Sequence, residues 1–168
     1  MLRVLIPVDG SENSLLGVRH AVKRFFVNSE QELHLLHVLT PFTRHVSQFT
    51  SRKNRESYHH EMAGRALSPA QELLGKYSIP YGVHIELGDK AETIDRVAQR
   101  LRVDQIVMGT ARKNSLMRLI EDSVTNRVLE IARVPVEVIA GGEVSKLEKY
   151  GLPAGIGAAL AALLVAAD

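Results

Sequence analysis

Apolar residues along this chain follow two alternating patterns. Short apolar runs of strand length alternate with longer stretches in which apolar residues recur at helical spacing. The runs predict strands at Leu2–Val8, Leu33–Leu39, Tyr81–Leu87, Asp104–Met108 and Val134–Ala140. The helical spacing predicts helices over Asn13–Phe26, Ala91–Leu101 and Ser123–Arg133. This alternation requires right-handed crossovers, so it predicts an α/β fold with an open parallel five-stranded sheet and helices on both faces.

Three stretches need a more specific interpretation. Residues 40 to 62 are polar and basic without a clear period, which predicts a loop that leads into a helix. Within that helical region, Ser68 and Pro69 predict a break, with Ser68 as the cap of a new segment. Tyr81–Leu87 alternates apolar and polar residues, which is typical of an edge strand with one wet, polar face.

The ends of two predicted strands carry the candidate chemistry. Asp9 follows the first strand, and Gly109 and Thr110 follow the fourth. In open α/β sheets, ligands bind beyond the carboxyl ends of the strands where the winding reverses. We therefore expect these two ends to form one site.

The opening VLIPVDGSENS, the second strand ELHLLHV and the segment VDQIVMGTARKNSLMRLIEDSVTNRVLEIARVPVEVI resemble the universal stress protein (UspA-like) family. The similarity covers about residues 1 to 140. It implies the strand order 3-2-1-4-5, a homodimer formed through Val134–Ala140 and, in one branch of the family, an ATP site. The positions that match the family's nucleotide pocket are Asp9, the backbone of Val38, Gly109, Thr110, Ser123 and Val124.

The ATP-binding branch carries the pattern Gly-x2-Gly-x9-Gly-Ser/Thr, which maps here to Gly109, Arg112, Asp122 and Ser123. Two of the three glycines are therefore replaced. Arg112 could itself meet a phosphate, whereas Asp122 at a helix start would repel one. We expect the repulsion to dominate, so that no cofactor is bound, or ATP only weakly. A switch or weak ATPase that binds ATP remains the alternative.

Other chemistry is weakly indicated. Ser11, Ser115 and Ser123 are interpreted as caps or turn residues, so no catalytic residue is assigned. The adjacent His59 and His60 are interpreted as solvated, and no metal site is assigned. The formal net charge is only +2, with both signs scattered along the chain, which argues against a nucleic-acid surface. The absence of cysteine excludes disulfides and thiolate metal sites.

The C-terminal tail is the part that differs from a plain family domain. We expect an α/β domain over residues 1–142 and a helical tail over 143–168, in which Gly151–Ala167 carries no charge. This stretch is shorter than the roughly 20 residues that span a bilayer. Docking on the domain, the dimer mate or a partner protein is favoured over membrane association. With no signal-peptide run at the start, a cytoplasmic location is expected.

The function that these features favour is a regulatory or interaction module in stress adaptation, without catalysis. Two alternatives stay open: the ATP-dependent switch, and a tail-tethered regulator of a membrane protein.

Overall fold

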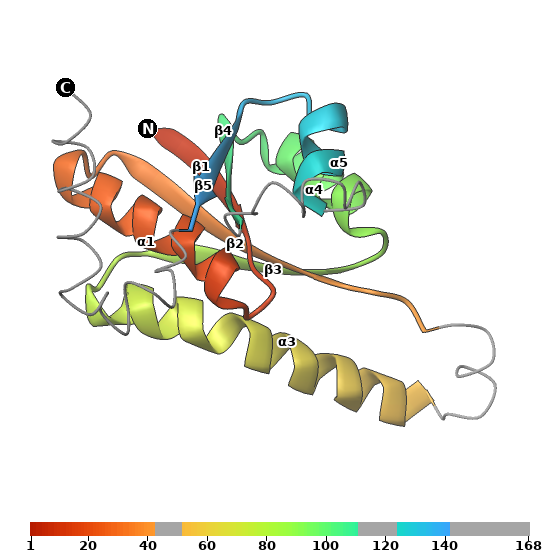
Figure 1. Cartoon of the computed structure of the whole chain (residues 1–168). Helices are drawn as coiled ribbons and strands as arrows, with labels where there is room; N and C mark the ends of the chain where they lie inside the picture. The colour runs from red at the N-terminus through yellow and green to blue at the C-terminus, as the bar shows by residue number, and fades with distance from the viewer. Residues whose placement is uncertain (43–51, 111–123, 142–168) are drawn as a thin grey trace, which may run out of the picture.

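The computed structural model describes residues 1–42, 52–110 and 124–141, and strands alternate with helices through these ranges (Figure 1). The strands are β1 (Leu2–Pro7), β2 (Gln31–Leu39), β3 (Tyr81–Leu87), β4 (Gln105–Thr110) and β5 (Val136–Ala140). The helices are α1 (Glu12–Val27), α3 (Arg52–Lys76), α4 (Lys90–Leu101) and α5 (Val124–Ile131). The predicted α/β alternation is confirmed.

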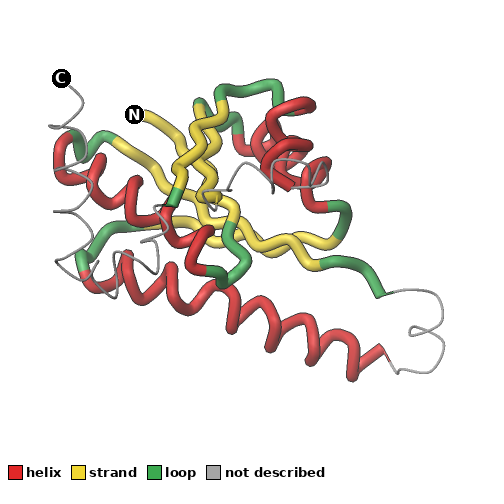
Figure 2. The backbone as a smooth tube through the Cα atoms, in the orientation of Figure 1, coloured by secondary structure: helices red, strands yellow, loops and turns green. Residues whose placement is uncertain are grey.

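The strands form one parallel sheet in the order β3-β2-β1-β4-β5, as the family resemblance implies. In Figure 2 this sheet, drawn in yellow, lies between the red helices. The central strand β1 pairs with β2 on one side and β4 on the other, with Ile6 opposite Leu35 and Leu5 opposite Ile106. The winding of the chain therefore reverses between β1 and β4, and the carboxyl ends of these two strands lie side by side.

Two apolar cores fill the space between the sheet and its helices. On one face, α1 and α3 bury residues such as Val18, Leu67 and Leu74 against Ile6 and Leu35. On the other face, α4 and α5 bury Ile94, Val97 and Val128 against Leu5 and Leu36. Because β1 and β2 contribute to both cores, their apolar runs show no alternation.

Helix α3 begins earlier than the sequence pattern indicated. Residues 52 to 62 were expected to belong to a loop, but they form the first turns of a helix of 25 residues. This part of α3 extends past the end of the sheet (Figure 1), and most of its described side chains are exposed. An exposed helix needs no apolar stripe, which explains the missing period.

The predicted break at Pro69 is also wrong, because α3 continues through it. The Ser68 hydroxyl does not cap a new helix but donates a hydrogen bond to the Glu72 carboxylate at 2.7 Å. Leu67 and Ala70, which flank Ser68 and Pro69 in the sequence, are buried against the sheet. Their burial holds together a helix that lacks one backbone donor.

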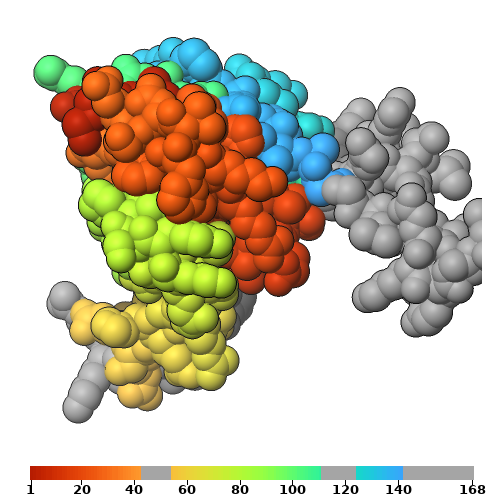
Figure 3. Space-filling view, turned by 90° about the vertical axis from the view of Figure 1, so that its left-hand side faces the viewer, coloured from red at the N-terminus to blue at the C-terminus, as the bar shows by residue number. Residues whose placement is uncertain are grey.

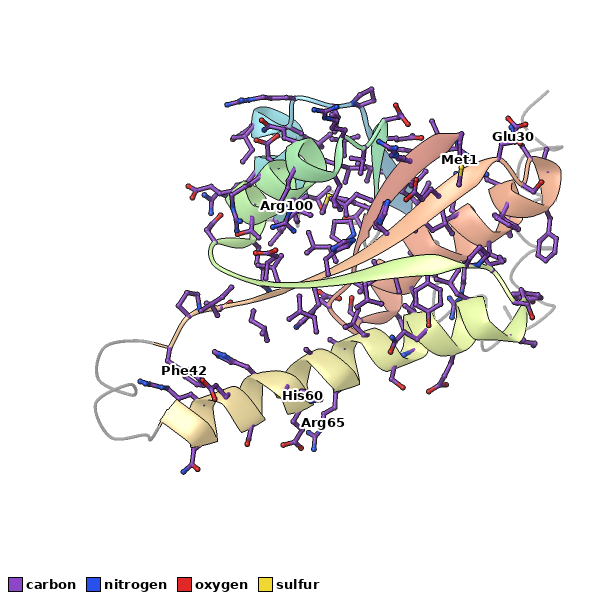
Figure 4. The ribbon with its side chains drawn as sticks, turned by 180° about the vertical axis from the view of Figure 1, so that it is seen from behind. Met1, Glu30, Phe42, His60, Arg65 and Arg100 are labelled. Atoms are coloured by element: carbon purple, nitrogen blue, oxygen red, sulfur yellow. The ribbon has the colours of Figure 1, made fainter. Side chains whose placement is uncertain are left out.

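Strand β3 is an edge strand, as predicted, but its wet face is the apolar one. Val83, Ile85 and Leu87 are 40 to 50% exposed, whereas His84 and Glu86 are half-buried. Glu86 faces α4, and its carboxylate lies 2.7 Å from the guanidinium of Arg100 on that helix. Figure 4 labels Arg100. Ion pairing with α4 therefore fixes the orientation of this strand, and the apolar side is left open to solvent.

The last elements are close to their predicted positions. Strand β5 begins at Val136, two residues later than expected, and α5 is described from Val124 to Ile131. Strand β5 is an edge strand beside β4. Among the described residues, no helix is long and apolar enough to cross a membrane. The predicted tail helix within 143–168 lies outside the described residues.

Candidate functional site

A pocket of about 310 Å³ opens at the carboxyl ends of β1 and β4, where the winding reverses. Five of the residues predicted from the sequence line it: Asp9, Val38, Gly109, Thr110 and Val124. The expected convergence of the two strand ends is therefore found. The other lining residues are Pro7, Val8, Ser11, Asn13, Ser14, Leu36, Lys90, Ile94, Met108 and Thr125.

The loop after β1 is held by a closed set of hydrogen bonds around Asp9. One carboxylate oxygen of Asp9 accepts from the Ser11 backbone at 3.0 Å and from the Ser11 hydroxyl at 2.6 Å. The Ser11 hydroxyl in turn caps α1 by accepting from the Ser14 backbone at 3.2 Å. The Ser14 hydroxyl accepts from the Asp9 backbone and donates to the Ser11 carbonyl. Both serines are thus structural partners of Asp9, and Ser11 caps α1, as its interpretation from the sequence expected.

The Asp9 carboxylate is charged at neutral pH. Burial by itself would raise the pKa of this carboxyl. The hydrogen bonds from Ser11 and Ser14, together with the positive charge of Lys90, outweigh burial and hold the pKa below its ordinary value. The pocket therefore presents a fixed anionic acceptor, which is suited to the hydroxyl or amino donors of a ligand.

The wall of the pocket on the α4 and α5 side is apolar. Leu36 and Val38 from β2, Ile94 from α4 and Met108 from β4 line it. These residues also belong to the core beneath α4 and α5, which fixes their positions. A flat ring with polar substituents matches such a cavity, with one apolar wall and polar groups at one side.

Gly109 is required by packing within the domain. A Cβ atom on Gly109 would overlap the backbone carbonyl oxygen of Asn13 and lie 3.1 Å from the Cβ of Leu16. The first turn of α1 therefore rests directly on the end of β4. Gly109 was expected after the strand, but Gly109 and Thr110 continue β4, opposite Ile139 and Ala140 of β5. The Gly109 peptide is thus rigid where it borders the pocket.

Sequence reasoning missed Lys90, the first residue of α4. Lys90 comes from a third strand-to-helix connection, after β3, which the sequence did not link to the pocket. The predicted site residues Arg112 and Ser123, together with Asp122, lie outside the described residues. Within the described ranges, no group of three His, Asp or Glu side chains could hold a metal ion.

The sheet order and the pocket define an open parallel α/β domain with a cavity at the point where its winding reverses. Residues 1–140 match the universal stress protein family. The chain therefore belongs to that family.

Known relatives agree with this assignment. The chain is 28% identical over 146 residues to universal stress protein MJ0531 of Methanocaldococcus jannaschii, covering 82% of this chain and 81% of that one. The solved structure of MJ0577, from the same organism, has a TM-score of 0.64 at 26% identity and covers 84% and 96%. A family member from Arabidopsis thaliana, solved with AMP bound, has a TM-score of 0.61 at 16% identity and covers 86% and 95%. At that identity, the Arabidopsis structure shows the common fold alone.

Proposed function

We propose that this protein is a regulatory module of stress adaptation that binds the nucleoside part of an adenine nucleotide and does not hydrolyse it. The observation that carries this proposal is the convergence of five family pocket positions on one cavity of about 310 Å³. A cavity of this size is within the usual range for small-molecule sites. That the Arabidopsis relative was solved with AMP bound supports an adenine nucleotide as the ligand class.

In this proposal, the two sides of the pocket have different roles. The apolar wall formed by Leu36, Val38 and Ile94 covers the faces of the base. The charged Asp9 carboxylate accepts hydrogen bonds from ligand hydroxyl groups. Because Ser11 fixes this carboxylate before a ligand arrives, little ordering is needed on binding.

A non-catalytic role is supported by what the polar groups of the pocket already do. The hydroxyls of Ser11 and Ser14 are engaged in capping α1 and in holding Asp9. Among the residues that the structure describes, neither hydroxyl is paired with a histidine that would activate it as a nucleophile. The replacement of two motif glycines by Arg112 and Asp122 further supports weak binding of a triphosphate.

A tryptophan placed in the pocket tests this proposal directly, because its large side chain would occupy the space that the ligand needs. Thr125 lines the pocket on α5, so Thr125→Trp should fill it and weaken the binding of adenosine and AMP at least tenfold in calorimetry. Leu129→Trp is the matched control on the same helix, since Leu129 is 51% exposed and lies outside the pocket. It should bind both ligands as the native protein does.

Two results would contradict the proposal. One is that neither adenosine nor AMP binds the native protein at millimolar concentration. The other is equal binding by the Thr125→Trp and Leu129→Trp variants. Release of phosphate from Mg-ATP by the native protein, lost in the Thr125→Trp variant, would favour the ATPase alternative.

We also propose the homodimer through Val134–Ala140. Within this range, β5 (Val136–Ala140) is an edge strand, and Figure 3 shows the blue segment at the surface beside α1. Pairing with a second copy would satisfy the backbone groups along this edge. The support is the position of β5, and its test is given in the Discussion.

A further inference from the structure

Two histidine rings from neighbouring strands contact each other on the face of the sheet that α4 covers. His34 of β2 is buried, and His84 of the edge strand β3 is half-buried. The Nε2 atom of His84 lies 3.2 Å from the Nδ1 atom of His34, at hydrogen-bond distance. Gly82, which is opposite His34 in the register, makes room for this contact, because a Cβ atom there would lie 2.9 Å from Nδ1 of His34. The two rings therefore connect β3 to β2 through their side chains.

A hydrogen bond between two imidazole rings depends on their protonation. One facing nitrogen must donate its N–H, and the other must accept with a free lone pair. On the far side of its ring, Nε2 of His34 lies 3.3 Å from the Glu32 carboxylate, where it can donate. Nδ1 of His34 is then free to accept from His84. When both rings are protonated, both facing nitrogens are donors, so the hydrogen bond is lost and two positive charges meet.

The charged groups around the pair do not compensate this repulsion. Glu32 is already paired with Arg3 of β1 at 3.2 Å. Glu86 of β3 is paired with two arginines of α4, Arg100 at 2.7 Å and Arg96 at 3.5 Å. In the described part of the chain, two carboxylates thus face three guanidinium groups around the pair. This cluster carries a net positive charge before either ring is protonated, and each added proton increases it.

The pKa of His84 reflects these surroundings. Burial lowers this pKa most, and the charges of His34 and Arg100 lower it further, which outweighs the opposite effect of Glu86. A histidine in an unfolded chain takes up its proton near about pH 6.5. Because His84 binds its proton less readily in the folded protein, the free energy of unfolding should fall as the pH decreases through about 6.5.

The position of β3 gives the contact between the rings a consequence for the pocket. As an edge strand, β3 pairs only with β2 (Figure 1), and its apolar face is open to solvent. The strand is followed closely by α4, which begins at Lys90. Lys90 and Ile94 of that helix line the pocket. A movement of β3 away from β2 would therefore displace one wall of the pocket.

We propose that the His34–His84 pair is an acid-sensitive latch. While at least one ring is neutral, the hydrogen bond between the rings holds β3 to β2. When both rings are protonated, this bond is lost, and β3 opens together with the start of α4. For its effect on ligand binding, the inference rests on the proposed function, whereas the latch itself is testable without a ligand.

Amide hydrogen exchange of the full chain tests the latch, measured at about pH 7.5 and about pH 5, on either side of the ordinary histidine pKa, and corrected for the intrinsic effect of pH. The variants are His84→Gln and His34→Gln, because glutamine does not titrate and can still donate or accept a hydrogen bond. The matched control is His60→Gln, since His60 is an exposed histidine on α3. Histidine ring signals in NMR follow the protonation, and circular dichroism checks that each variant folds.

In the native protein, we expect the β3 amides to exchange about tenfold faster at the lower pH, roughly the effect of one lost hydrogen bond. His60→Gln should show the same acceleration, and His84→Gln and His34→Gln should show little. In His34→Gln, the His84 ring should take up its proton at a higher pH than in the native protein, because one positive neighbour is absent. Saturating adenosine should slow β3 exchange, since only the closed form has the complete pocket.

Three outcomes would overturn the latch: no acid acceleration in the native protein, an acceleration that survives both glutamine variants at His34 and His84, or an His84 ring whose titration does not depend on His34. If adenosine binds but leaves β3 exchange unchanged, the link between the latch and the pocket is wrong and the proposed function stands. If adenosine does not bind, the proposed function fails, and the exchange measured without ligand still decides the latch.

Discussion

Replacing Gly109 by alanine tests the close contact between α1 and β4. A Cβ at this position would overlap the Asn13 carbonyl oxygen and lie 2.8 Å from its carbonyl carbon. These are backbone atoms, which cannot rotate away as a side chain can, so the first turn of α1 must move. Overpacking typically costs about 1–3 kcal/mol, and a contact with backbone belongs at the upper end. We therefore expect Gly109→Ala to lower the free energy of unfolding by about 3 kcal/mol.

This loss should be visible in thermal unfolding followed by circular dichroism. For a protein of this size, each kcal/mol shifts the melting temperature by about 2–4 °C, which gives a decrease of roughly 6–12 °C. The displaced α1 should also weaken adenosine binding, because Asn13 and Thr110 line the pocket on either side of the contact.

Gly64→Ala is the matched control. Gly64 lies inside α3, and a Cβ there meets no atom within 4 Å. Replacing this glycine by alanine should raise the free energy of unfolding by about 0.5–1 kcal/mol, since alanine is the better helix former. If Gly109→Ala were as stable as the native protein and bound adenosine normally, the reasoning from this contact would be refuted.

The remaining predictions concern the nucleotide-binding motif, the edge strand β5, the loss of stability at acidic pH and the C-terminal tail. Arg112→Gly combined with Asp122→Gly should raise the affinity for Mg-ATP in calorimetry; low-micromolar affinity in the native protein would contradict the expected weakness. Val138→Lys should convert the proposed dimer to a monomer in analytical ultracentrifugation, and a variant that stays dimeric would argue against β5 as the interface. Asp9 has a lowered pKa in the folded protein, so its charge stabilises the fold above about pH 4 and this contribution disappears as the pH falls further. The stability difference between the native protein and Asp9→Asn, measured by urea unfolding, should accordingly shrink below that pH. A chain that ends at Gly142 should unfold as cooperatively as the full chain, because both described cores lie before it; recovery of the full chain only from detergent would favour a membrane-associated tail.

The sequence by itself determined the alternation of elements and the place of the site. Buried parallel strands need uninterrupted apolar runs, and LRVLIPV and LHLLHVL provide them. Once the strands are parallel, their carboxyl ends must share one edge of the sheet. Asp9 and Thr110 were therefore predictable as neighbours without any coordinates. These features depend on local periodicity, which the sequence contains, and on the right-handedness of crossovers, which holds for parallel sheets in general.

Only the tertiary structure decided the features that depend on which residues lie opposite one another. The wet face of β3 is apolar because Arg100 of α4 pairs with Glu86, a contact that spacing along the strand cannot show. Pro69 remains inside α3 because burial on the sheet outweighs the lost hydrogen bond. Lys90 becomes a pocket residue through the position of α4 beside β2, far from Asp9 in sequence. In each case a contact between distant segments overrides a local preference, because its energy depends on a spatial arrangement that no local pattern contains.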